Sequence, residues 1–189
     1  MSFLKMLLGF APWISFLIIA HDSMFRLKLG IVVAAVLSVV MAVARLHRGV
    51  IMYVSILFFL YSIVAVVFMN DMWTVRYMSV LANGSLAIGV WIGLALKRPF
   101  TLEYSRETTA PSLWEDHVFL RTNYLLTTMW AVVFTISVLL AWQRSIQPAM
   151  PIWAYETISY SLLVSAMFVS TWFPKYIKKH REAATAHAD

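Results

Sequence analysis

Cysteine is absent from this 189-residue sequence. Its absence excludes disulfide bonds, thiol nucleophiles, cysteine-based zinc sites and iron–sulfur clusters. Charged residues are also scarce, at 13% of the chain, whereas apolar residues make up 61% and aromatic residues 15%. The core of one soluble domain is too small to bury that much apolar surface. We therefore expect an integral membrane protein in which lipid covers much of the apolar surface.

Several short signatures of function are missing as well. The sequence has no glycine-rich phosphate loop and no G-x-S-x-G motif, so nucleotide-driven transport and serine hydrolysis lack their usual marks. Its five histidines show no pairing at metal-binding spacing, and we expect no metal and no cofactor. The net charge of +6 comes from basic residues in short loops, a pattern typical of membrane orientation. We expect no nucleic-acid partner.

Six apolar stretches are long enough to cross a bilayer as helices, since about 20 residues span about 30 Å. They cover approximately residues 3–20, 27–44, 50–69, 73–96, 124–142 and 152–173. The first is short and contains Pro12, so we expect it to tilt, to kink or to lie partly in the interface. A cleaved signal peptide is the alternative, but no A-x-A pattern precedes Ala20. The sequence predicts an all-α polytopic transmembrane bundle over residues 1–173 and a basic cytoplasmic tail over 174–189.

The distribution of lysine and arginine predicts the orientation. One side of the predicted membrane collects eleven of these residues and the other side four. Basic residues concentrate in cytoplasmic loops, so both termini are expected in the cytoplasm. Residues 97–121 then form a polar cytoplasmic loop between the fourth and fifth spans, next to anionic lipid headgroups.

The start of this loop, "KRPFTLEYSRE", carries five charges in eleven positions, at residues 97–107. Pro99 suits the first position of a helix, and we expect an interfacial helix after it. Its apolar side chains should dip toward the headgroups; these are Phe100, Leu102 and Tyr104. Lys97 and Arg98 are expected to hold the end of the fourth span against anionic headgroups.

The acidic residues of the loop need a different explanation. Glu103 and Glu107 lie four residues apart, and Arg106 lies three residues from Glu103. A local salt-bridge network is favoured over a metal site or a catalytic pair, and we expect this face to meet a partner or neighbouring cytoplasmic loops. Farther on, "SLWE" resembles a capping box in which Ser112 begins a helix that continues into the fifth span.

Two spans carry small residues at intervals of four, a pattern that allows helices to approach closely. They are Ser85, Gly89 and Gly93 in the fourth span, and Ala34, Ser38 and Ala42 in the second. Packing within one chain is the favoured interpretation, and a homodimer seam is the alternative.

Two polar residues inside predicted spans are candidates for function. Glu156 is the only acidic residue clearly inside a span, and intramembrane carboxylates usually face protein or a cavity. The alternative is a structural role near the outer interface, in which Glu156 pairs with Arg76 or Arg144. Asn83 is favoured to make an interhelical hydrogen bond, with contact to a ligand as the alternative.

Three short motifs resemble a known family. They are "GFAPWISF" at residues 9–16, "KRPF" at 97–100, and "LTTMWAVVF" at 126–134 after Trp114. Together with the order and spacing of the apolar runs, they resemble the intracellular septation protein A family of small bacterial inner-membrane proteins. The resemblance covers most of the chain. It implies a location in the bacterial inner membrane and a role in envelope maintenance through contact with division or elongation proteins, and it supplies no catalytic residues.

The sequence therefore favours a structural or interaction role in the cell envelope, exerted through residues 97–121, and no enzymatic activity. The alternative is a small-solute, ion or proton transporter that uses Glu156 and Asn83. A lipid-acting membrane enzyme is a third class, which rests only on the polar loop beside the headgroups. A water-sized cavity that reaches Glu156 would favour the transporter.

Overall fold

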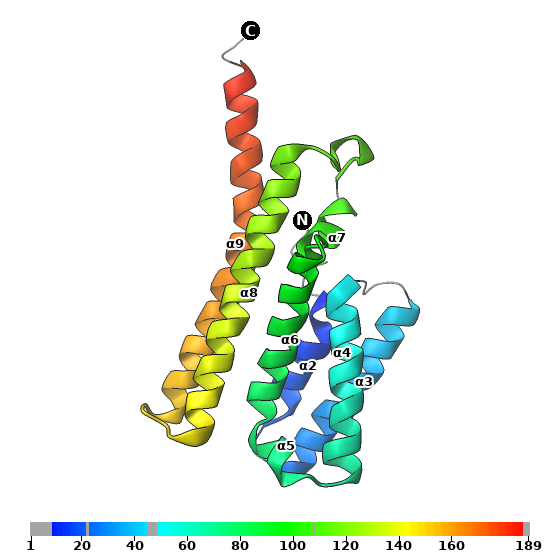
Figure 1. The fold of residues 1–189 in the computed structure, drawn as a ribbon, viewed down its shortest axis with the longest axis vertical. Coiled ribbons are helices and arrows are strands. Elements are labelled where there is room, and N and C mark those ends of the chain that lie inside the picture. Colours follow the sequence, from blue (N-terminus) through cyan, green and yellow to red (C-terminus); the bar gives the residue numbers. More distant parts are fainter. Residues whose placement is uncertain (1–8, 22, 45–48, 108, 187–189) are drawn as a thin grey trace.

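Helices form all the regular structure that is described in the computed structural model, which covers residues 9–21, 23–44, 49–107 and 109–186 (Figure 1). The all-α prediction is confirmed over these ranges. In chain order the helices are α2 (Ala11–Ile19), α3 (Met24–Val43), α4 (Gly49–Ser62), the π-helix η1 (Ile63–Phe68), α5 (Met72–Arg76), α6 (Met78–Ala95), α7 (Phe100–Arg106), the 3-10 helix η2 (Pro111–Leu113), α8 (His117–Ile146) and α9 (Ile152–Ala186).

Five helical segments are long and apolar enough to cross a membrane. They are α3, α4 with η1, α6, α8 and the Ile152–Ile177 part of α9, and they coincide with the second to sixth predicted spans. Large apolar side chains cover their outer surfaces, for example Val36 at 55% exposed and Val43 at 79% exposed. Such a surface is stable in lipid and not in water. The five helices indicate a multi-pass membrane protein.

The first predicted span is only partly described. Its described part is α2, which has nine residues and is too short to cross a bilayer by itself. Residues 1–8, the rest of that prediction, lie outside the described residues. Aromatic packing holds α2 in the bundle, because Phe10 stacks on Trp130 at 5.3 Å between ring centroids and Trp13 stacks on Phe58 at 5.1 Å.

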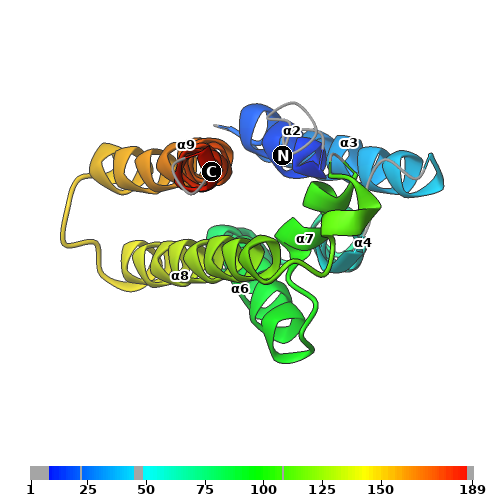
Figure 2. The ribbon, with the colours of Figure 1, turned by 90° about the horizontal axis from the view of Figure 1, so that it is seen from above.

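Figures 1 and 2 show α8 and α9 side by side as a long antiparallel pair, with α6 packed between α8 and α4, and α2 against α3. The short helices α5 and α7 lie at opposite ends of the bundle (Figure 1). Among the described helices, α9 packs mainly against α8. It therefore stands at the edge of the bundle.

Three boundaries differ from the predictions. The fourth span begins with the separate helix α5, whose N-cap Asp71 accepts hydrogen bonds from the backbone amides of Trp73 and Thr74. The N-cap of α8 is Asp116, not Ser112, because the Asp116 carboxylate accepts from two amides of the first turn. The last helix continues through Pro174 to residue 186, so the tail is helical up to that residue.

The small residues of α6 pack inside the chain. A Cβ atom at Gly89 would collide with Val54 of α4, and one at Gly93 would lie 3.1 Å from the Arg98 carbonyl oxygen and 3.5 Å from Val50. In the second stripe, Ala34 and Ser38 are fully buried. Packing within one chain is confirmed for these positions, and the homodimer stays a prediction.

Candidate functional site

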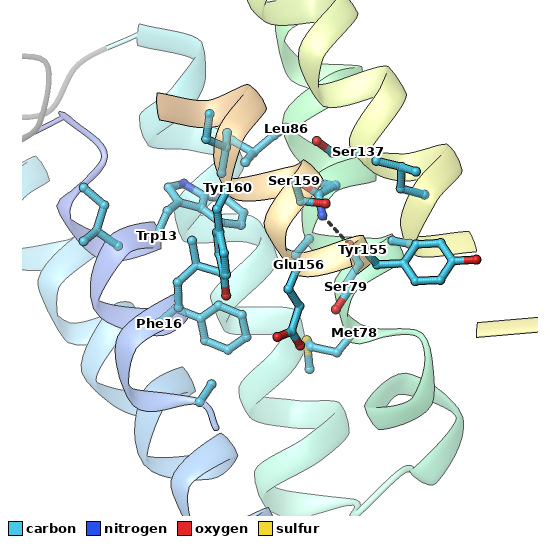
Figure 3. A pocket seen from close by; sticks show the side chains of 18 of the residues that line it. Trp13, Phe16, Met78, Ser79, Leu86, Ser137, Tyr155, Glu156, Ser159 and Tyr160 are labelled. Atoms are coloured by element: carbon cyan, nitrogen blue, oxygen red, sulfur yellow. Dashed lines mark hydrogen bonds between the residues drawn. The ribbon is translucent and has the colours of Figure 1, made fainter. Parts of the chain in front are cut away.

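A cavity of about 600 Å³ lies between α2, the start of α3, α6, α8 and α9 (Figure 3). Both intramembrane candidates from the sequence, Glu156 and Asn83, line it. The two residues are distant in sequence, but α6 and α9 bring them to the same cavity. The sequence alone left open whether a cavity reaches Glu156.

Glu156 pairs with Arg144. An Arg144 guanidinium nitrogen lies 3.3 Å from a Glu156 carboxylate oxygen, and the two side chains are 37% and 41% exposed. The predicted pairing with Arg144 is therefore confirmed, whereas Arg76 donates a hydrogen bond to the Ser145 carbonyl oxygen at 3.2 Å. An ion pair this exposed contributes only about 0.2–1 kcal/mol to stability. Both charged groups therefore can exchange partners at low cost.

The ion pair sits where α8 ends and α9 begins. Arg144 is in the last turn of α8, and Glu156 is in the second turn of α9. The short connection between them is fixed in part by Tyr155, whose hydroxyl accepts a hydrogen bond from the Ala149 amide at 2.9 Å. The charges of the cavity thus lie at one end of the α8–α9 pair.

Asn83 does not make the expected interhelical hydrogen bond through its side-chain nitrogen. That nitrogen donates to the Ser79 carbonyl oxygen within α6, at 2.8 Å. The side chain is half-buried at the cavity wall. The bond fixes the orientation of the amide without tying α6 to another helix.

The wall changes from polar to apolar along α9. Glu156, Ser159 and Tyr160 line the end nearest the loop, and Leu163 and Met167 line the deeper part. In Figure 3 the Glu156 carboxylate points toward Met78, with Tyr160 and Phe16 on the neighbouring wall. The cavity therefore has one charged end and one apolar end.

Two tryptophans at the deep end already have their hydrogen bonds satisfied. The Trp13 indole nitrogen donates to Ser55 Oγ at 2.7 Å, and that of Trp130 donates to Ser170 Oγ at 2.8 Å. Both rings line the cavity. Their N–H groups are occupied and the rings are 5% and 0% exposed, so these side chains bring no free hydrogen-bond donor to the deep end.

Sequence reasoning missed Ser137, Ser159 and Tyr160 as cavity residues. A signal existed in α9, because positions 156, 159, 160, 163 and 167 repeat at intervals of three to four and share one helix face. Identifying that face as a cavity wall required the neighbouring helices.

The "KRPF" segment forms the turn between α6 and α7. The Arg98 amide donates to the Gly93 carbonyl oxygen at 2.8 Å and the Lys97 amide to that of Leu94 at 3.0 Å, which together make a Schellman C-cap. Lys97 occupies the left-handed position of this motif, with φ of 58°. Pro99 is buried and directly precedes the first residue of α7. The side chains of Lys97 and Arg98 are exposed, as contact with headgroups requires.

The prediction that α7 dips its apolar side chains toward headgroups is wrong. Phe100, Leu102 and Tyr104 are 1%, 8% and 5% exposed and are buried within the protein. Two small polar side chains of α7 explain the difference because they bond to Asn123 of α8. Thr101 Oγ1 donates to its carbonyl oxygen and Ser105 Oγ to its side-chain oxygen, both at 2.8 Å.

The two charged residues of α7 and the charged C-cap residue do not form one outward face. Glu103 is half-buried, and its carboxylate occupies the space beside Gly49, the first residue of α4. Arg106 is exposed and its guanidinium lies 5.3 Å from the ring centroid of Trp114. Glu107 is exposed at the C-cap. Of the two expected contacts for Glu103, the structure favours the neighbouring segment of the same chain.

Searches of protein-family models, curated proteins and solved structures found no match to this chain.

Proposed function

We propose that this protein is a membrane transporter whose binding site is the cavity at Glu156. The observation that carries the proposal is the cavity of about 600 Å³, which reaches both Glu156 and Asn83. Its volume lies within the range of about 300–1,000 Å³ that is common for small-ligand sites. A purely structural role gives no reason to keep a charged cavity of this size between apolar helices.

The position of α9 supports a moving part. This helix packs mainly against α8. A displacement of α9 would change the cavity and disturb mainly its contact with α8, whereas α8 packs extensively against α6 and would stay in place. Rocking of one bundle against another around a central site is a common basis of alternating access. The exposed Arg144–Glu156 pair opens at a cost of about 1 kcal/mol or less, so it does not lock the cavity shut.

The proposed location is the bacterial inner membrane, as a multi-pass protein with both termini in the cytoplasm. The resemblance to the septation protein A family supports the membrane, and the distribution of eleven against four basic residues supports the orientation. The Glu156 end of the cavity then faces the outer side. Reporters fused after Asp189 and near Thr109 should both report cytoplasm, and a periplasmic signal from either fusion would contradict this orientation.

Thiol labelling tests the transporter, since the chain has no cysteine of its own. Ser159→Cys places one thiol in the cavity wall, and Ser165→Cys places one on the exposed face of the same helix. Thiols react as thiolates, which lipid suppresses and water permits. We expect Ser159→Cys to react with an impermeant reagent from the outer face of cells and also from the cytoplasmic face of inverted vesicles, and Ser165→Cys to react from neither. Reaction from one face only, or from none, would refute alternating access.

A role in the cell envelope is the second candidate. The exposed positions of Arg106 and Glu107 favour it, because they leave charge on the surface of the α7 segment. Charge reversal at these two residues should remove a copurifying membrane partner or an envelope phenotype. Reversal at Lys97 and Arg98 should disturb orientation or yield instead. Normal partners and a normal envelope in the first variant would exclude this role for the loop.

A further inference from the structure

We infer that the ligand of this cavity is a zwitterionic amphiphile with a single apolar chain. Its phosphate contacts Arg144, its ammonium contacts Glu156, and its chain lies along the deep wall. The inference rests on the proposed transport function and names the class of substrate.

The charged end fits a headgroup that carries both signs. The guanidinium and the carboxylate are 3.3 Å apart, and both are partly exposed. When the pair opens, a zwitterion gives each group a partner of opposite charge. A purely anionic ligand would leave the Glu156 carboxylate without a partner, and a purely cationic ligand would do the same to Arg144. Binding removes water from both groups, so a charge that is left without a partner in the complex is costly.

The deep end fits an apolar chain. From Glu156 to Met167, α9 advances eleven residues, which is about 16 Å along the helix axis. Over this distance the wall becomes Leu163 and Met167. Behind them lie Trp13 and Trp130, which are 5% and 0% exposed and whose N–H groups are already bonded to serines. A wholly polar solute would be desolvated here without hydrogen-bond partners.

The size and position of the cavity favour one chain. A volume of about 600 Å³ suits a headgroup with a single chain better than a whole two-chain lipid. The wall includes α2 and α9, which stand across from each other when the bundle is seen from above (Figure 2). Since α9 packs mainly on α8, the side toward α2 is the natural route for an amphiphile that arrives from the bilayer.

The test measures binding of defined probes to the purified full-length chain by native mass spectrometry. The probe is oleoyl lysophosphatidylethanolamine. The comparisons are oleoyl lysophosphatidylglycerol, phosphoethanolamine without a chain, and dioleoyl phosphatidylethanolamine. We expect one lysophosphatidylethanolamine per chain and at least tenfold weaker binding of lysophosphatidylglycerol. Each buried methylene tightens binding roughly fourfold, so phosphoethanolamine alone should bind more than a hundredfold more weakly.

Two pairs of variants assign the two ends of the ligand. Glu156→Gln should abolish the preference for the ethanolamine headgroup over the glycerol headgroup, and the exposed control Glu115→Gln should retain it. Leu163→Trp fills the deep end and should weaken binding at least tenfold, whereas Val164→Trp, on the adjacent residue at 66% exposed, should not. If Leu163→Trp does not fold, the comparison of lysophosphatidylethanolamine with phosphoethanolamine on the unaltered protein still tests whether the ligand has an apolar chain.

Equal binding of the two lysolipids would overturn the zwitterionic assignment. If phosphoethanolamine bound as tightly as lysophosphatidylethanolamine, the ligand would need no apolar chain and that assignment would be wrong. Tighter binding of the two-chain lipid would overturn the single-chain assignment. The labelling of Ser159→Cys requires no ligand. If Ser159→Cys is labelled from both faces but the protein shows no preference among the lipid probes, only the ligand class is refuted. If Ser159→Cys is not labelled from both faces, transport is refuted.

Discussion

Replacing Gly89 by alanine should destabilise the bundle, whereas the same change at Gly84 should not. Both glycines lie in α6, five positions apart. A Cβ atom at Gly89 collides with Val54 Cγ2 and lies 3.5 Å from Val54 Cβ, but one at Gly84 meets nothing within 4 Å. Valine is stiff at χ1, so Val54 has no alternative rotamer that yields easily.

The magnitude follows from two opposing terms. Alanine is favoured over glycine in a helix by about 1 kcal/mol, and this gain is common to both variants. Overpacking a close contact costs about 1–3 kcal/mol and applies to Gly89 alone. We therefore expect Gly84→Ala to be about 0.5–1 kcal/mol more stable than the parent and Gly89→Ala to be up to about 2 kcal/mol less stable. The difference between them, about 1–3 kcal/mol, isolates the contact with Val54.

Reversible unfolding of the purified protein in mixed micelles, followed by circular dichroism, measures this difference. In the Val54→Ala protein, Gly89→Ala should destabilise the bundle less than it does in the parent, because the colliding methyl group is gone. A Gly89→Ala protein as stable as Gly84→Ala would show that α6 and α4 are farther apart than described, and the packing argument would fail.

Three other changes test separate contacts. Ser170→Ala removes the acceptor of the buried Trp130 N–H and should cost about 0.6–1.7 kcal/mol in the same unfolding assay. Lys97→Gly relieves a left-handed backbone with φ of 58° and should stabilise the protein by about 1 kcal/mol. A hydrogen bond from the Thr74 side chain lowers the pKa of Asp71 below its ordinary value of 3.8, so its contribution to stability is present above that pH and is lost as the pH falls further. Melting temperatures between about pH 3 and 6 should show this acid-sensitive part in the parent and lack it in Asp71→Asn.

Five of the six predicted spans coincide with described helices, because a long apolar run satisfies its backbone hydrogen bonds in lipid as a helix. The predicted stretch 50–69 matches the described helical segment Gly49–Phe68 within one residue at each end. Glu156 could be identified for a related reason, since it is the only acid clearly inside an apolar run. The sequence left its partner open between Arg76 and Arg144, and the structure pairs it with Arg144.

The burial of α7 could not be predicted from the sequence. Its charges indicated a surface helix, but Thr101 and Ser105, four residues apart, bond to Asn123 of α8. Which face of a short helix is buried depends on a partner eighteen or more residues away. The cavity could not be predicted for the same reason, because it is formed by the spacing of helices from both halves of the chain.

The uneven distribution of charge along the sequence links the proposed topology to the membrane potential. Under the proposed topology, the cytoplasmic segments of the sequence carry eleven basic and six acidic residues, and the outer segments carry four basic and three acidic residues. The net charges are +5 and +1, a difference of four. A membrane potential, negative inside, acts on each charge with about 2.3 kcal/mol per 100 mV, so inverting the protein would cost about 9 kcal/mol per 100 mV. In the proposed orientation the membrane potential would therefore contribute to stability by itself, and dissipating the potential would remove that contribution without altering a single contact.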